Sequence, residues 1–233
     1  MAVDLPIPNR FLAALPPDDL KRLRPHFQMA DEPLGKVLIE MGDPMPYLYF
    51  PDGGMTSLLI RLEDGAAIEV GVVGKEGFAG LPALFGSTKA PHENMVQLPG
   101  TFARIKTGIV LVEMRRSPAL LDRVLRYAQA MYGQIAQTAV CNVHHALPER
   151  LARWLLMAHD RAETDQLPLT QEFLSIMLAV RRPGVSVAAN TLQQTGAVAY
   201  HRGRITVLDR ERLEQAACEC YGMAKEQFDH LLG

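Results

Sequence analysis

The spacing of hydrophobic and polar positions changes along the chain. Residues 9–28 carry apolar positions at helical spacing, and Pro16-Pro17-Asp18-Asp19 restarts the helix between them. From Leu34 to about Arg104, brief apolar runs such as KVLIE, YLYF, TSLLIRL and AIEVGVV are separated by turns rich in glycine and aspartate. Short strands at regular spacing are typical of a β-sandwich or jelly roll. The sequence therefore predicts a short helical segment followed by an all-β domain.

A long helix is predicted after Ser117-Pro118, because serine is a good N-cap and proline suits the first helical position. Apolar positions then follow at alternating spacings of four and three, at Leu121, Leu125, Ala128, Tyr132, Ile135 and Ala139. Residues 127–148 form a stretch of 22 without Lys, Arg, Asp or Glu, so a helix here is not expected to meet water on every side. Packing on the β domain alone or a dimer interface would satisfy it, and we favour the dimer interface.

The C-terminal region predicts a helix, a tight turn, a second helix and a hairpin. Pro148 is expected to end the long helix, and Glu149–Arg161 to form the next one. Thr170 is a predicted N-cap, and a turn at residues 178–180 leads to a helix with Pro183 in its first turn. The buried face of that helix is predicted at Val185, Ala188, Ala189 and Leu192, its end at Gly196, and the hairpin at residues 197–208. This order is typical of a winged helix-turn-helix, whose second helix enters the DNA major groove.

The charge distribution of this region favours an anionic partner. The whole chain has a net charge of −2, which argues against a basic nucleic-acid binder of the kind that is positive all over. Residues 179–206, however, contain no Asp or Glu, while Arg181, Arg182, Arg202 and Arg204 are present. Acidic side chains there would repel phosphates from the second helix and from the hairpin.

Composition excludes several other classes of protein. A hydrophobic content of 48% in 233 residues suits one large or two smaller domains with a proper core. The start MAVDLPIPNRF does not resemble a signal peptide, no stretch suits a membrane span, and three cysteines form no disulfide framework. We therefore expect a cytoplasmic protein that does not enter a membrane. It is not expected to be an enzyme, because it has no nucleophile elbow, phosphate-binding glycine loop or His-Glu-x-x-His.

Together these segments resemble the Crp/Fnr family of bacterial transcription regulators over nearly the whole chain. In the β domain the resemblance lies in Gly35-Lys36-Val37-Leu38, Gly42-Asp43, Tyr47–Phe50 with Gly53-Gly54, and Gly77–Leu84. In the C-terminal region it lies in Arg150–Leu156, Leu169–Leu174, Val180–Leu192 and the hairpin. It implies an α+β fold in three parts. These are an N-terminal β-roll or jelly-roll sensor domain of the cyclic-nucleotide-binding type (1–116), a long dimerisation helix (117–147) and a C-terminal winged helix-turn-helix domain (148–233).

The resemblance implies a homodimeric, sequence-specific DNA-binding transcription regulator. Its partners would be double-stranded DNA with a near-palindromic operator and, as a further partner, RNA polymerase. Arg182, Pro183 and Val187 fall where family members contact bases. Arg182 suits guanine O6 and N7, whereas Pro183 and Val187 offer only apolar or shape contacts. Phosphate contacts are expected from Thr170, Gln171, Arg181, Ser186, His201, Arg202 and Arg204.

The effector segment departs from the members that bind cyclic nucleotides. Those members carry a Gly-Glu-Leu whose Glu takes the ribose hydroxyl, and an Arg further along that neutralises the phosphate. Here Gly80 and Ala90 stand at these two positions, and neither Lys89 nor His92 offers a bidentate fork. We expect a degenerate effector pocket at Gly77, Phe78, Gly80, Leu81, Lys89, Ala90 and His92, with no cofactor and no dependence on cyclic AMP, and with an effector that the sequence does not identify.

A metal site is not expected either. Residues 1–140 contain no cysteine, which excludes the N-terminal iron–sulfur centre of the oxygen-sensing members. Cys141 and His145 are spaced to share a helix face, with His144 beside them, and metal binding is an alternative there to simple packing at a helix end. Cys218 and Cys220 are predicted on a C-terminal helix, where their spacing suits packing better than a disulfide.

Two alternatives to this function remain open. One is a regulator gated by another small effector in the β-roll. The other is a sensory or protein-interaction module that does not bind DNA, and steep salt dependence of DNA binding would exclude it.

Overall fold

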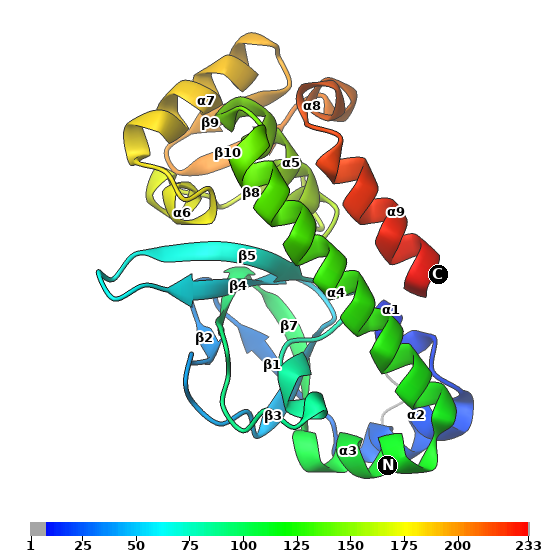
Figure 1. The fold of residues 1–233 in the computed structure, drawn as a ribbon. Coiled ribbons are helices and arrows are strands. Elements are labelled where there is room, and N and C mark those ends of the chain that lie inside the picture. The colour runs from blue at the N-terminus through cyan, green and yellow to red at the C-terminus, as the bar shows by residue number, and fades with distance from the viewer. Residues whose placement is uncertain (1–7, 233) are drawn as a thin grey trace.

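The computed structural model describes residues 8–232, which form a β domain, a long helix and a smaller mixed domain (Figure 1). The N-terminal segment contains helices α1 (Arg10–Ala13) and α2 (Pro17–Leu23) and the 3-10 turn η1 (Arg24–His26). The β domain contains β1 (Gln28–Glu32), β2 (Val37–Ile39), β3 (Tyr47–Pro51), β4 (Met55–Arg61), β5 (Ala67–Val73), the 3-10 turn η2 (Leu81–Phe85), β6 (Glu93–Leu98) and β7 (Gly100–Lys106).

The strands form two antiparallel sheets, with the orders β1-β7-β3 and β2-β6-β4-β5. The predicted all-β domain is therefore confirmed. The domain begins earlier than the pattern predicts, because Gln28 opens β1 rather than ending the helical segment. The sequence QMADE has little strand character, and its pairing with β7 makes it a strand.

The long helix begins where the sequence predicts it. Helix α3 (Thr107–Arg116), which the pattern did not predict, precedes α4 (Pro118–His144). The Ser117 hydroxyl accepts a hydrogen bond from the backbone N–H of Leu120 at 3.1 Å, as an N-cap does. The prediction that Pro148 ends this helix is wrong. The break lies at residues 145–146, and Pro148 is in the first turn of α5 (Leu147–His159), where its missing N–H is not needed.

The C-terminal domain has the predicted order of elements. After α5 come β8 (Gln166–Leu167), α6 (Gln171–Met177), α7 (Arg182–Gln194), β9 (Val198–His201), β10 (Arg204–Val207), α8 (Arg210–Ala216) and α9 (Cys220–Leu232). Strands β8, β10 and β9 form a small antiparallel sheet, and α9 runs back beside α4 (Figure 1). The side chains predicted to be buried on α7, which are Val185, Ala188, Ala189 and Leu192, are at most 2% exposed.

The two apolar faces of helix α4 differ in their exposure to solvent. Leu120, Val124, Tyr127, Met131 and Gln134 are buried on the face toward the rest of the chain. The face predicted from the sequence is largely exposed, with Leu125 at 51% and Tyr132 at 76%.

The β domain and the C-terminal domain share one core. A single buried cluster joins Leu59 and Val72 of the β domain to Trp154 of α5 and Met177 of α6. The Trp154 indole N–H also donates to Glu69 of β5 at 2.8 Å. The structure therefore fixes the second domain against the sheet β2-β6-β4-β5. None of the helices within residues 8–232 combines the length and apolar character needed to cross a membrane.

Candidate nucleic-acid interface

The helix-turn-helix is built by local capping and one strained residue. The Thr170 hydroxyl accepts from the backbone N–H of Phe173 at 3.2 Å and caps α6. Ala179 has a φ of 52°, a left-handed conformation that reverses the chain between α6 and α7. Arg181 is the N-cap residue of α7 and uses no side-chain cap, and Pro183 lies in the first turn. Pro183 has no backbone N–H, and that of Gly184 donates to the carbonyl oxygen of Arg181 at 2.9 Å, so the leading end of α7 offers an anion its arginine side chains rather than a row of free backbone N–H groups.

The structure brings the candidate DNA-binding residues to one surface of the C-terminal domain. Gln171 and Ser186 are half-buried, and the others are exposed, namely Thr170, Arg181, Arg182, Pro183, Val187, His201, Arg202 and Arg204. These residues come from the start of α6, the first half of α7 and the hairpin between β9 and β10.

The hairpin is held tightly and close to α6. Arg202 and Gly203 form its two-residue turn, with φ values of 47° and 77°, between the paired residues His201 and Arg204. A Cβ on Gly203 would lie 3.3 Å from Cγ2 of Thr170, so the turn packs on the start of α6. The wing tip and Thr170 therefore form one continuous edge.

The arginines of this surface differ in how firmly they are held. The Arg182 guanidinium lies 3.9 Å from the Glu172 carboxylate, and Arg204 donates to the side chain of Gln166 at 3.3 Å. Within residues 8–232, Arg181, Arg202 and His201 have no side-chain hydrogen bond or ion pair. These side chains are therefore free to meet an anion without first breaking a contact.

One exposed residue of α7 was not among the DNA-binding residues predicted from the sequence. Asn190 is exposed and lies three residues after Val187 and seven after Pro183, which places all three on one face of the helix. An asparagine side chain can pair with adenine N6 and N7. The helical period from Pro183 and Val187 would have identified it.

The predicted effector pocket is only partly assembled. Phe78, Gly80, Leu81 and His92 line a cavity of about 210 Å³ together with Tyr127, Met131, Tyr132 and Ile135 of α4. Gly77, Lys89 and Ala90 do not line it. Ala90 is buried elsewhere, and its backbone exchanges hydrogen bonds with Gly42 and Asp43.

The chemistry of this cavity differs from that of a phosphate site. No Lys or Arg from the described residues lines it, and most of its walls are aliphatic or aromatic. Apart from the hydroxyls of Tyr127 and Tyr132, its polar side chains are His92 and Asn94, and the amide oxygen of Asn94 is buried without a hydrogen-bond partner among the described residues. Burial lowers the pKa of His92, which disfavours a positive charge at this position. The cavity suits a small apolar ligand with one donor group.

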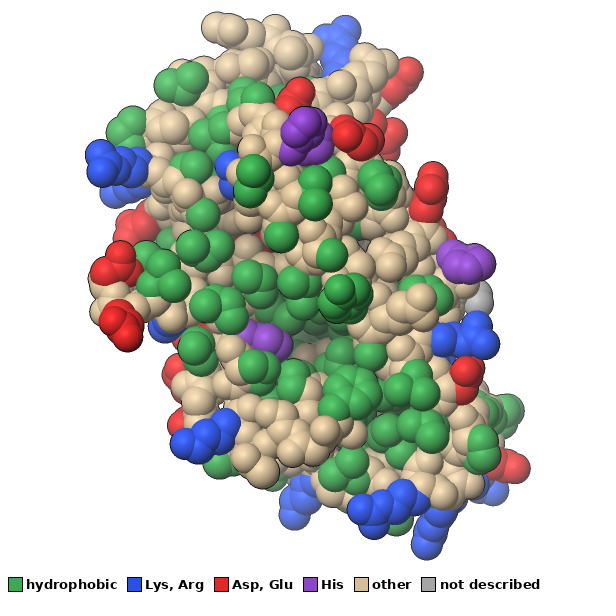
Figure 2. All heavy atoms as spheres, in the orientation of Figure 1, with side chains coloured by type: hydrophobic (Ala, Val, Ile, Leu, Met, Phe, Trp, Pro, Cys, Tyr) green, Lys and Arg blue, Asp and Glu red, His purple; other side chains and the backbone are tan. Residues whose placement is uncertain are grey.

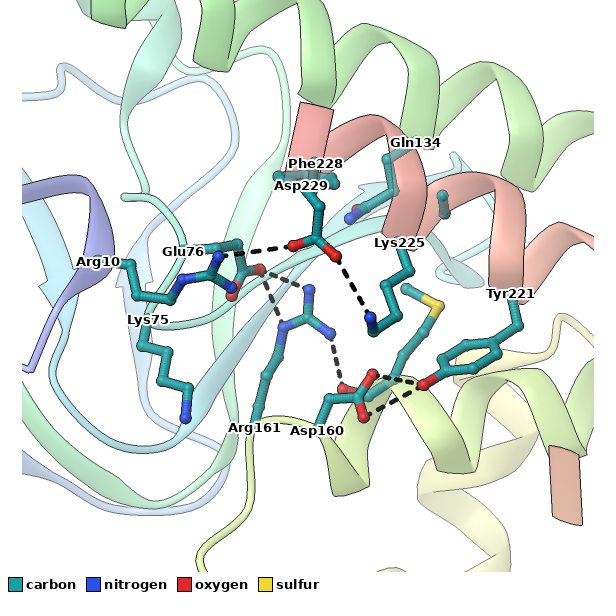
Figure 3. Close-up of a pocket in the computed structure, with 12 residues that line it drawn as sticks. Arg10, Lys75, Glu76, Gln134, Asp160, Arg161, Tyr221, Lys225, Phe228 and Asp229 are labelled. Carbon is teal, nitrogen blue, oxygen red and sulfur yellow. Dashed lines mark hydrogen bonds and ion pairs between the residues drawn. The ribbon is translucent and has the colours of Figure 1, made fainter. Parts of the chain in front are cut away.

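A second cavity, of about 280 Å³, lies between the β domain, α5 and α9 (Figure 3). Most of its charged side chains are paired with one another. Arg161 donates to Glu76 at 2.9 Å, Asp229 lies between Arg10 and Lys225, and the Tyr221 hydroxyl donates to Asp160. The cavity therefore lies at a contact between domains, where Arg10, Arg161 and Lys225 already have carboxylate partners, whereas Lys75 has no ion pair among residues 8–232.

The cysteines are not arranged as the sequence predicted. Cys218 lies before α9 and only Cys220 belongs to it, so the two do not share a helix. Both meet Cys141 and His145 at the end of α4. His144, the third residue considered there, is exposed and contacts the ring of His145.

Comparison with known proteins agrees with this geometry. Residues 149–216 match the family model described as the Crp-like helix-turn-helix domain. No curated protein matches the sequence. The solved structures that are similar include FixK2 from Bradyrhizobium japonicum, with 14% identity, 82% of this chain and 98% of that chain covered, and a TM-score of 0.70.

Two further solved structures have comparable scores. A putative transcriptional regulator of the Crp/Fnr family from Eubacterium rectale is 19% identical, with 88% and 95% of the two chains covered and a TM-score of 0.67. The c-di-GMP responsive global regulator CLP from Xanthomonas campestris is 17% identical, with 82% and 99% covered and a TM-score of 0.66. The chain therefore has the fold of the Crp/Fnr transcriptional regulators, and its residues 149–216 form a Crp-like helix-turn-helix domain.

Proposed function

We propose that this protein is a homodimeric transcription regulator that binds a specific, near-palindromic DNA sequence without cyclic AMP. The observation that carries the proposal is the surface formed by the start of α7 and the wing. It holds the side chains of Arg181 and Arg202, which have no partner among residues 8–232, and residues 179–206 contain no acid. RNA polymerase is the further partner through which such a regulator would act.

The residues of this surface have two kinds of proposed role. Arg182 reads guanine in the major groove, and Pro183 and Val187 contact thymine methyl groups or the shape of the groove. Asn190 joins them as a reader of adenine. The remaining polar residues bind phosphates, which orient the protein without specifying sequence. They are Thr170, Gln171, Arg181, Ser186, His201, Arg202 and Arg204.

The exposed face of α4 is the proposed dimer interface. The proposed division of the chain is accordingly a sensor domain (1–116), a dimerisation helix (117–147) and a DNA-binding domain (148–233). Apolar side chains gather along α4 on the surface of the protomer (Figure 2). They include Leu121, Leu125, Tyr132, Ile135, Val140 and Val143, which are 37–91% exposed. If two protomers pack through α4 about a two-fold axis along this helix, these side chains become covered. The same arrangement would present two α7 helices to DNA half-sites about 34 Å apart.

The β domain supports independence from cyclic AMP. Gly80 stands where the ribose-binding Glu would be, and its φ of 96° is a left-handed conformation that disfavours any side chain. A Cβ there would also lie 2.9 Å from the Leu48 side chain. A regulator gated by a small apolar effector is the second candidate function. The apolar cavity favours it, because Tyr132 and Ile135 of α4 belong both to the cavity and to the exposed face of the helix.

The first test is selection of genomic DNA fragments by the purified full-length protein, with and without cyclic AMP. We expect enrichment of one near-palindromic sequence in both conditions. Enrichment only with cyclic AMP would overturn the assignment of the β domain. Weak binding that is insensitive to salt would favour a protein-interaction module instead.

Two variants separate the proposed roles. Arg202→Ala should weaken binding equally for all sequences and lower the slope of log K against log salt by about one. Arg182→Ala should instead cost about 1–3 kcal/mol on the selected site and relax the preference at one base position. Arg116→Ala, at an exposed position on α3, is the matched control and should change neither property. Equal effects of all three variants would contradict the proposed surface.

A further inference from the structure

Four potential metal ligands converge where α4 ends and α9 begins. They are the thiols of Cys141, Cys218 and Cys220 and the imidazole of His145, and their ligand atoms all lie within 4.8 Å of one another. The sulfur atoms of Cys141 and Cys218 are 3.5 Å apart, and Nδ1 of His145 is 3.5 Å from the sulfur of Cys220. All three thiols are buried, and the side chain of His145 is only 10% exposed.

Two of these separations are close to the edges of a coordination tetrahedron. With Zn–S bonds of about 2.3 Å and Zn–N bonds of about 2.0 Å, ligand atoms around a tetrahedral zinc ion lie roughly 3.5–3.8 Å apart. The Cys141–Cys218 and Cys220–His145 separations of 3.5 Å lie at the lower limit of this range. The widest separation between ligand atoms would have to shorten by about 1 Å, through side-chain adjustments, for all four atoms to lie 2.0–2.3 Å from one zinc ion. A disulfide does not account for the geometry, because an S–S bond is about 2.05 Å long.

The surroundings of the histidine are those of a metal ligand. While Nδ1 of His145 faces the cysteines, its Nε2 lies 3.1 Å from a carboxylate oxygen of Glu219. Ligating histidines almost always donate their second ring N–H to a carboxylate, a carbonyl or a water, which fixes the tautomer and the orientation of the ring. Glu219 therefore holds the proton on Nε2 and leaves the lone pair of Nδ1 directed at the cluster.

Polar side chains also surround the cysteines. The Gln137 amide donates to the sulfur of Cys220 at 2.9 Å. The Arg153 guanidinium donates to the Thr138 hydroxyl of α4 at 3.0 Å and lies close enough to Cys141 to interact with it electrostatically. Arg153 is itself buried, at 6% exposure. Zinc with three thiolates and one imidazole carries one negative charge, which this guanidinium would offset.

We propose that Cys141, His145, Cys218 and Cys220 form a tetrahedral zinc site with three sulfur ligands and one nitrogen ligand. Soft thiolates together with an imidazole in tetrahedral geometry select zinc among the common divalent ions. Four protein ligands leave no open position, so the site is structural. It joins the end of α4 to the turn between α8 and α9, across the point where the chain passes from the long helix into the DNA-binding domain.

The direct test is the metal content of the full-length protein, purified without metal affinity resin. We expect one zinc per chain, retained on gel filtration. After removal of zinc under reducing conditions, Co²⁺ should bind with one equivalent and give the intense visible absorption of tetrahedral cobalt together with sulfur-to-cobalt charge transfer. A protein with no zinc, no Co²⁺ spectrum and three freely titratable thiols would overturn the proposal.

Variants test the ligand set without relying on the folding of a disturbed core. His145→Ala should lose zinc or bind it far more weakly, whereas His144→Ala, one residue away and exposed, should keep one zinc per chain. Glu219→Gln replaces a side chain that is 69% exposed and should lower the zinc affinity by about 10–100-fold, measured by competition with a chelator. If His144→Ala and His145→Ala retained zinc equally, the proposed ligand set would be wrong.

Discussion

Glu69 shows at the residue scale how the two domains depend on each other. Its carboxyl group is enclosed between β5 and α5, where it accepts hydrogen bonds from the Ser57 hydroxyl and the Trp154 indole. Burial raises the pKa of Glu69 to about 7, although these hydrogen bonds and the charges of Arg153 and Arg161 oppose the shift. An acid whose pKa is raised on folding stabilises the protein below its unfolded pKa, and this contribution is lost as the pH rises through the folded value.

Glu69→Gln is therefore expected to stabilise the protein at high pH only. Near pH 4.5 both side chains are neutral in the folded state, and the two proteins should unfold with similar free energies. By pH 8 the variant should be more stable by up to about 3 kcal/mol, since each unit of pKa shift corresponds to about 1.4 kcal/mol. Urea unfolding at several pH values measures the difference. Glu63→Gln, in an exposed turn, should show no such trend, and a pH-independent effect at residue 69 would contradict the argument.

At the scale of elements, helix α4 carries apolar side chains on two different faces. Its buried face packs on the β domain, and Tyr127 both donates to the carbonyl of Phe78 and accepts from its N–H. Its other apolar face has no partner within residues 8–232. Apolar side chains on a helix gain free energy when they leave water, so this second face accounts for the absence of charge along residues 127–148.

Leu125→Glu is expected to separate the proposed dimer. The side chain is 51% exposed on the protomer, so the substitution should leave the fold intact while placing a charge in an apolar interface. Sedimentation of the variant should give a monomer, and its affinity for a two-half-site operator should fall by at least tenfold. Met29→Glu introduces the same change at an exposed position of β1 and should remain dimeric. A wild-type protein that is monomeric at micromolar concentration would exclude the interface.

At the scale of the whole molecule, an ion pair connects the C-terminal domain to the β domain. Arg161 follows the end of α5 and Glu76 follows β5, and each side chain is 11% exposed (Figure 3). Removal of one partner from a buried pair leaves an uncompensated charge. Because the two domains also share a core, the loss should be felt in the unfolding of the entire chain.

Arg161→Met is expected to lower the free energy of unfolding by about 3–5 kcal/mol, because Glu76 would remain buried without its cation. The double variant Arg161→Met with Glu76→Gln should recover most of this loss, since no charge is then left unpaired. Chemical denaturation of the four proteins of this cycle gives the coupling energy. Additive effects of the two substitutions would show that the pair does not link the domains.

The sequence by itself determined the elements whose partners are near in the chain. Ser117 and Thr170 cap their helices, Pro183 starts α7, and the turn at Arg202-Gly203 forms the wing, because each depends on contacts within a few residues. The buried face of α7 followed from its period for the same reason. The exposed surface proposed to meet DNA was therefore visible before the fold was known.

Only the tertiary structure decided the features that join distant segments. Strand β1 exists because β7 pairs with it, and Lys89 and Ala90 are excluded from the cavity by the path of their loop. The cysteines show the difference most clearly. Cys141 is separated by 77 residues from Cys218, so no local spacing could place both beside His145. Local rules fix capping and periodicity, whereas the packing of α9 on α4 fixes which side chains meet.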